Sequence, residues 1–168
     1  MIASHKIIFN TGILYAKLLI VMVLGLFSVR IILGALGETD YGIYSLVAGV
    51  VGMLGMLQGA MTSASMRFMS HSLGSNDEQL ILKTFNTTLF LHFVIGIGVV
   101  LIIEIGGYFM FEYLLNIPPN KIYDAKIVFH FMAITTFITI IAVPYDAVIN
   151  SHENLLFLSL VDIFGAIL

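Results

Sequence analysis

The stretch that decides the fold runs from residue 36 to residue 55 and reads LGETDYGIYSLVAGVVGMLG. It begins with a short acidic corner, residues 37–40, and continues as an apolar run in which glycines recur. Another long apolar run, residues 7–36, precedes the corner. A helix needs about 20 apolar residues to cross the hydrocarbon core of a bilayer, and both runs are long enough. The stretch therefore predicts two transmembrane helices joined by a tight polar corner.

The composition of the whole chain agrees with this interpretation. Of the 168 residues, 60% are hydrophobic and 10% are charged, whereas soluble domains carry about 25% charged residues. The net charge of −3 argues against a nucleic-acid partner, which would require a basic patch. Cysteine is absent, which excludes a disulfide framework and a thiolate metal site within these residues. We therefore interpret the chain as an integral membrane protein, with no cofactor or metal indicated.

Five apolar segments predict the spans. They cover about residues 7–36, 43–72, 82–111, 124–148 and 154–168, the last of them incomplete. None of them alternates with the period of two that a transmembrane barrel requires. The predicted fold is all-α: a single transmembrane domain over residues 1–168, built as a polytopic helical bundle. Pro144 is expected to end or kink the fourth helix close to its carboxyl end.

The distribution of basic residues predicts the orientation in the membrane. Lys6, Arg67 and Lys83 collect on one side, and Lys121 and Lys126 on the other. The positive-inside rule then favours a cytoplasmic amino terminus and an outward-facing corner at residues 37–40.

Small residues recur at helical spacing in the second predicted span. Ala48, Gly52, Gly55, Gly59 and Ser63 share one face of a continuous helix. In lipid, small residues let helix backbones approach closely, so this face predicts a helix-packing seam. A seam that slides during transport is the alternative interpretation.

Ionisable residues inside the spans are candidates for function, because each costs about 2.5–3.5 kcal/mol at the helix centre on insertion scales. Lys17 is flanked by long apolar stretches, which favours a functional role. Arg30 is equally consistent with a side chain that reaches the outer interface, and Arg67 with an inside anchor. Glu104 either caps the outer interface or pairs with a cation. The histidines of the third and fourth spans, His92 and His130, are expected to be neutral and hydrogen-bonded rather than metal ligands.

No catalytic set assembles from the sequence. Zinc-protease, nucleophile-elbow and P-loop motifs are absent, so no enzymatic activity is predicted. The charged side chains in the first two spans are mainly cationic. A cavity lined by these two spans would suit an anionic ligand, most simply a phosphate or a diphosphate.

Four stretches, in order along the chain, resemble polysaccharide flippases of the Wzx type. These proteins belong to the multidrug/oligosaccharidyl-lipid/polysaccharide exporter superfamily. The stretches are Asn10-Thr11, LGETDYGIYSLVAGV (36–50), SASMRFMSHSLGSND (63–77) and VPYDAVINSHENLLFLSLVDIF (143–164). The resemblance implies that the chain forms the amino-terminal part of a MATE-like lobe and that the whole protein is longer.

The resemblance also implies a function. Such flippases export undecaprenyl-diphosphate-linked oligosaccharide across the cytoplasmic (inner) membrane by alternating access, in O-antigen and lipopolysaccharide biosynthesis, often coupled to an ion gradient. By position, Arg30 and Arg67 would bind the diphosphate, with Lys17 as a further candidate and Glu104 as a candidate for the coupling ion. The implied partners are membrane lipid, a polysaccharide polymerase and glycosyltransferases.

Three alternatives remain open at this point. A cation-coupled multidrug exporter of the same superfamily would favour acidic cavity residues, of which Glu104 is the candidate. A small membrane scaffold protein would be complete at this length. An intramembrane transferase or phosphatase would need a carboxylate cluster at one interface, which the sequence does not offer.

Overall fold

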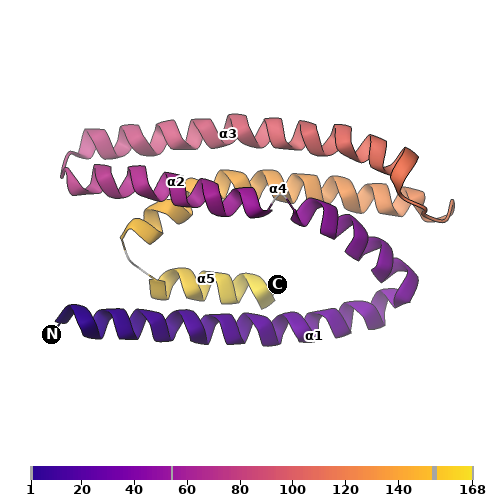
Figure 1. The fold of residues 1–168 in the computed structure, drawn as a ribbon, viewed down its shortest axis with the longest axis horizontal. Coiled ribbons are helices and arrows are strands. Elements are labelled where there is room, and N and C mark those ends of the chain that lie inside the picture. The colour runs from indigo at the N-terminus through magenta and orange to yellow at the C-terminus, as the bar shows by residue number, and fades with distance from the viewer. Residues whose placement is uncertain (1, 54, 153–154, 168) are drawn as a thin grey trace.

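The computed structural model describes residues 2–53, 55–152 and 155–167, which form an all-helical bundle (Figure 1). No strand occurs within these ranges. This confirms the predicted fold class. The helices are α1 (Ile2–Gly52), α2 (Gly55–Gly74), α3 (Glu78–Phe109), α4 (Ile122–Ser151) and α5 (Leu155–Ile167), and a π-helical turn at Met110–Leu114 follows α3.

Helix α1 bends sharply at Gly37. The residue has φ 77° and ψ 170°, a backbone conformation that is essentially restricted to glycine. Figure 1 shows α1 running along one side of the molecule and turning back at this point. The bend coincides with the acidic corner that the sequence predicts, and the chain beyond it returns across the bundle.

The return path differs from the continuous second helix predicted at residues 43–72. Helix α1 ends at Gly52 and α2 begins at Gly55, so the path consists of two half-helices. Glycine in a helix interior is about 1 kcal/mol less favourable than alanine, and glycines cluster in this part of the chain. The glycines that suggested a packing face also weaken the helix that would carry it.

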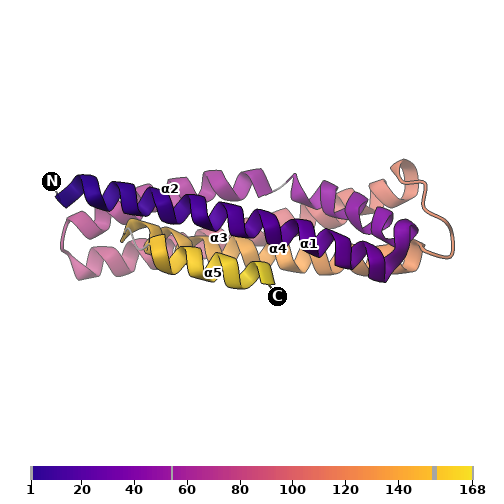
Figure 2. The ribbon, with the colours of Figure 1, turned by 90° about the horizontal axis from the view of Figure 1, so that it is seen from below.

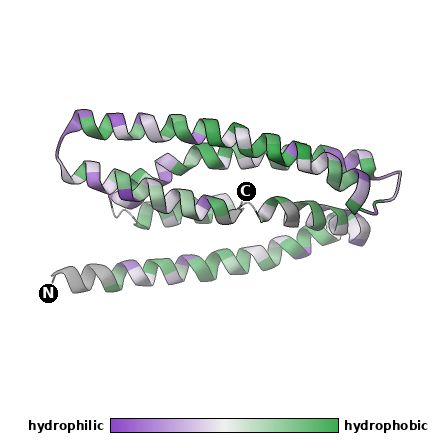
Figure 3. Ribbon diagram, turned by 45° about the horizontal axis from the view of Figure 1, so that its top comes forward, coloured by the Kyte–Doolittle hydropathy of each residue, from purple (hydrophilic) through white to green (hydrophobic). Residues whose placement is uncertain are grey.

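Three described helices are long and apolar enough to cross a membrane: Ile8–Gly49, Glu78–Leu114 and Ile122–Ser151. Figure 3 shows hydrophobic residues dominating these helices and hydrophilic residues gathering at the connections. Helix α2 is richer in serine and other polar residues, and α5 is apolar but shorter. The limits of the five individual spans remain predictions, and residues 154 and 168, at the ends of the fifth, lie outside the described residues.

Helix α4 continues through Pro144 and ends at Ser151. The proline is buried, and it does not end the helix. Because proline has no backbone N–H, the carbonyl four residues earlier loses its helical partner. Figure 1 shows the last turns of α4 bending toward α5, as a proline kink would direct them.

Helices α2, α3 and α4 pack together, whereas the first part of α1 lies beside α5 (Figures 1 and 2). The buried apolar core joins the second part of α1 to α3 and α4. Its members are Val47, Ile103, Met110, Phe129 and Ala133. The bundle is thus held by this core, while α5 links the first part of α1 to α4.

His92 is buried between α2 and α3 and has two hydrogen-bond partners. Its Nδ1 lies 2.7 Å from the Thr88 carbonyl oxygen, which can only accept, so Nδ1 carries the proton. Its Nε2 lies 3.4 Å from the Ser65 hydroxyl. The hydrogen bonding expected of this histidine is therefore present in the structure.

The acidic corner is tied to the start of α4 by an ion pair. Lys121 Nζ donates to Asp40 Oδ2 at 2.9 Å. The hydrogen bond and the negative charge of Asp40 raise the pKa of Lys121 above its ordinary value of 10.5. A raised lysine pKa stabilises the fold at pH values below 10.5, and this contribution is lost as the pH rises through the folded-state pKa.

We therefore expect an alkaline transition that depends on Lys121. The melting temperature of the purified protein in detergent should fall when the pH is raised above 10.5. The fall should be smaller in Lys121→Gln, which carries no titratable charge at this position. Equal falls in both proteins would mean that the corner pair does not contribute to stability.

Candidate functional site

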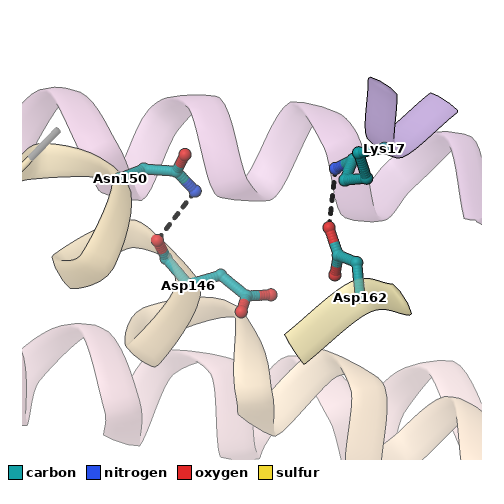
Figure 4. A network of polar contacts seen from close by, with 4 residues as sticks. All are labelled: Lys17, Asp146, Asn150 and Asp162. Carbon is teal, nitrogen blue, oxygen red and sulfur yellow. Dashed lines mark hydrogen bonds and ion pairs between the residues drawn. The ribbon is translucent and has the colours of Figure 1, made fainter. Parts of the chain in front are cut away.

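An ion pair joins the first and last helices of the described chain. Lys17 Nζ on α1 donates to Asp162 Oδ2 on α5 at 2.6 Å (Figure 4). Both residues lie in apolar helices, where an unpaired charge is costly. The pair compensates both charges and fixes α5 against α1.

A second carboxylate faces this ion pair. Asp146 of α4 is half-buried, and its side chain points toward Asp162 (Figure 4). The amide of Asn150 donates to the Asp146 backbone carbonyl at 2.9 Å, one helical turn away. The cluster thus contains two carboxylates and one ammonium, contributed by α1, α4 and α5.

The predicted diphosphate ligands are not brought together. The ammonium of Lys17 is engaged by Asp162. Arg30 and Arg67 are exposed, and neither makes an ion pair or hydrogen bond within the described ranges. Arg30 lies about two turns before the bend at Gly37, whereas Arg67 lies about two turns before the end of α2. The two guanidinium groups are therefore near opposite ends of the bundle.

Glu104, the candidate for the coupling ion, pairs with His130. Glu104 Oε1 lies 2.9 Å from His130 Nδ1, between α3 and α4. A hollow of about 250 Å³ adjoins the pair and is also lined by Lys126 and Phe111. Lys126 Nζ lies 5.9 Å from the centre of the Phe111 ring. In the described part of the chain, no group of three or more His, Asp and Glu side chains is arranged to hold a metal.

The sequence pattern of the MatE family matches residues 16–168. The chain belongs to the MatE family. Members of this family are membrane transporters and not enzymes, and the family match together with the long apolar helices indicates a multi-pass membrane protein of the transporter class. Comparison with curated proteins and with solved structures gave no match.

The small-residue face of this MatE chain is open in the structure. A Cβ atom added at Gly52 or Gly59 would meet nothing within 4 Å, and the Ser63 hydroxyl donates to the Gly59 carbonyl at 2.9 Å. The surroundings of Gly55 lie outside the described residues. Because α1 ends before α2 begins, these residues do not form one continuous face. The packing seam remains a prediction, with no partner helix on it among the residues described.

The closely packed glycines lie on α3 instead. A Cβ at Gly96 would lie 2.9 Å from Phe137 Cδ2, and one at Gly107 would collide with the ring of Phe129. These two glycines are three helical turns apart and so share one face of α3. Sequence analysis missed them because only two positions mark the face.

Sequence analysis also missed the two carboxylates of the cluster. Asp162 interrupts an apolar run, and this was the one available signal for it. Asp146 follows the proline of α4 closely and was not among the candidate residues. Their proximity to Lys17 depends on how α1, α4 and α5 pack, which no local pattern reveals.

Proposed function

We propose that this MatE protein exports undecaprenyl-diphosphate-linked oligosaccharide by alternating access. The observation that carries the proposal is that only one of the three candidate cations has an acidic partner. Lys17 has an acidic partner, whereas Arg30 and Arg67 have none within the described ranges. An arginine without a carboxylate partner suits a phosphate ligand, because the planar guanidinium binds phosphate oxygens in a bidentate manner.

Because the two arginines lie far apart, we propose that the diphosphate contacts them one after the other rather than in one shared site. The amino-terminal part of α1 and the carboxyl end of α2 lie at the same end of the bundle (Figure 1). Arg67 is near that end, and Arg30 is near the bend at the other end. In the proposed mechanism, Arg67 binds the diphosphate at the cytoplasmic face, where the amino terminus would lie, and Arg30 binds it at the outer face of the inner membrane.

This proposal predicts that each arginine contributes to export. We expect Arg67→Gln to lower the amount of surface glycan by roughly tenfold, because a hydrogen bond to a charged group contributes about 1.5–3 kcal/mol. Arg67→Lys should retain part of the activity, since the charge remains. The measurement is surface glycan in the native host, with the variant replacing the chromosomal copy and protein abundance checked by immunoblot.

Lys83→Gln is the matched control, because this exposed cation lies beside the connection between α2 and α3. Surface glycan should be unchanged in that variant. If Arg30→Gln and Arg67→Gln both export as well as the wild type, the arginines do not bind the substrate.

A cation-coupled multidrug exporter is the second candidate, and the cluster around Lys17 favours it. One carboxylate there, Asp162, pairs with the ammonium of Lys17, and a second, that of Asp146, lies nearby without an ion pair in the described residues. Carboxylates bind protons or other cations. Efflux of a cationic dye from cells that produce the protein separates the two candidates, because a glycan flippase leaves dye accumulation unchanged.

Membrane lipid, a polysaccharide polymerase and glycosyltransferases are the partners that the proposal implies. The polymerase would act on the oligosaccharide after export, and the glycosyltransferases would assemble it beforehand. The proposal assigns no catalytic step and no cofactor to this chain.

A further inference from the structure

A groove of about 540 Å³ lies where α1 ends and α2 begins, facing the middle of α4. Its polar lining comes from all three helices: Tyr44, Gln58, Thr135, Thr136 and Thr139. The remaining lining is apolar and includes the ring of Phe131. Binding sites for small molecules typically combine such an apolar wall with a few polar groups in about 300–1,000 Å³.

The groove lies at mid-depth in the bundle. Thr136 and Thr139 are near the midpoint of α4, and α4 is one of the helices long enough to span the membrane. The wall of the groove opposite α4 is formed by the end of α1 and the beginning of α2. Interrupted helices near the bilayer midplane are characteristic of substrate sites in transporters, because they expose polar groups where continuous helices do not.

The threonine hydroxyls present acceptors rather than donors to the groove. Each donates to the carbonyl one turn earlier on α4: Thr135 at 3.0 Å, Thr136 at 2.9 Å and Thr139 at 2.8 Å. With the hydroxyl hydrogens engaged, the lone pairs of the oxygens remain available. A ligand that fits this wall must therefore donate hydrogen bonds, as a sugar hydroxyl does.

The described lining of the groove is uncharged. None of the lining residues that the structure describes is acidic or basic, so neither a diphosphate nor a bare cation would find a counter-charge among them. Tyr44 and Phe131 offer aromatic faces of the kind against which the apolar face of a sugar ring can pack. The lining is thus matched to an uncharged, hydroxyl-rich ring.

We propose that this groove binds an uncharged sugar residue of the lipid-linked glycan, apart from the arginines that bind its diphosphate. The inference rests on the proposed function and deepens it by dividing the substrate between two kinds of site. The sugar donates hydrogen bonds to the threonine oxygens of α4, and Gln58 supplies both a donor and an acceptor from α2.

Single cysteines test this assignment, because residues 1–168 contain none. Thr136→Cys would be labelled with a small water-soluble maleimide in two kinds of membrane in which the protein is present. One comes from cells that make the glycan, and the other from cells that lack the first glycosyltransferase of the pathway. We expect labelling to be several times slower when the glycan is present, and Asn120→Cys, in the exposed connection before α4, to be labelled equally in both.

Equal labelling of Thr136→Cys in both membranes would overturn the assignment. So would the absence of labelling in both, which would mean that lipid or another helix fills the groove. Surface glycan is measured in the same cells. If glycan is exported normally but does not slow the labelling of the cysteine, the groove assignment is wrong while the proposed function stands. If the wild-type protein exports none, the proposed function fails.

A second pair of variants keeps the assignment testable if the cysteine perturbs the site. Thr136→Val combined with Thr139→Val removes two acceptors with little change in volume and should lower glycan export by roughly tenfold. The corresponding double serine variant keeps both hydroxyls and should export normally. Equal export by the valine and serine variants would contradict the role of the oxygens.

Discussion

Asp162→Asn is expected to destabilise the protein by about 2.5–3.5 kcal/mol, because it leaves the ammonium of Lys17 uncompensated in an apolar helix. In the native chain, Lys17 Nζ lies 2.6 Å from Asp162 Oδ2. Without that partner, α5 loses its polar link to α1, and the ammonium of Lys17 is left without an ion pair in the apolar helix. Thermal unfolding of the purified protein in detergent measures the loss.

A double variant separates the ion pair from packing effects. Lys17→Met with Asp162→Leu removes both charges and should recover most of the stability, since the cost lies in the unpaired charge. Glu112→Gln is the control, because this exposed carboxylate lies away from the pair. If the double variant is as unstable as the two single variants combined, Lys17 and Asp162 are not energetically coupled.

Gly107→Ala is expected to destabilise the bundle by about 1–3 kcal/mol, the usual cost of overpacking a core. The new methyl group would overlap the ring atoms Cε1 and Cζ of Phe129, which is buried in the core. The ring cannot move freely, because Phe111 packs against it edge to face at 5.6 Å between ring centres. The melting temperature in detergent should therefore fall.

Gly98→Ala supplies the matched control on the same helix. A Cβ there meets nothing within 4 Å, so alanine should be neutral or should stabilise α3 by about 0.5–1 kcal/mol. Phe129→Leu should partly rescue Gly107→Ala by freeing volume. If Gly107→Ala and Gly98→Ala have equal melting temperatures, the contact between α3 and α4 is looser than the structure indicates.

The fold class could be predicted because it depends on composition and on the length of apolar runs, which are local properties. The corner at residues 37–40 was predictable for the same reason: charge and glycine interrupt two such runs. The division of the second helix between Gly52 and Gly55 was not predicted. Its apolar pattern continues without a break, and the glycines were interpreted as a packing face of one continuous helix.

The site was less predictable than the fold. Lys17 was recognised as unusual because a lone charge in an apolar run is costly wherever the helix packs. Its partner Asp162 is distant in sequence, and their contact depends on α5 lying against α1. The packing of the glycines was unpredictable for the same reason. The spacing of glycines shows which of them share a helix face, but it does not show which neighbouring helix packs against that face.

The most direct test of the proposed function is transbilayer movement of the substrate itself. The full-length protein would be reconstituted into vesicles that carry radiolabelled undecaprenyl-diphosphate-linked oligosaccharide from the native host, with an impermeant glycosidase outside. If the protein flips this lipid, the glycosidase should digest nearly all of the label, whereas protein-free vesicles should retain the inner half. Retention of that half in vesicles with properly folded protein would contradict the proposed function.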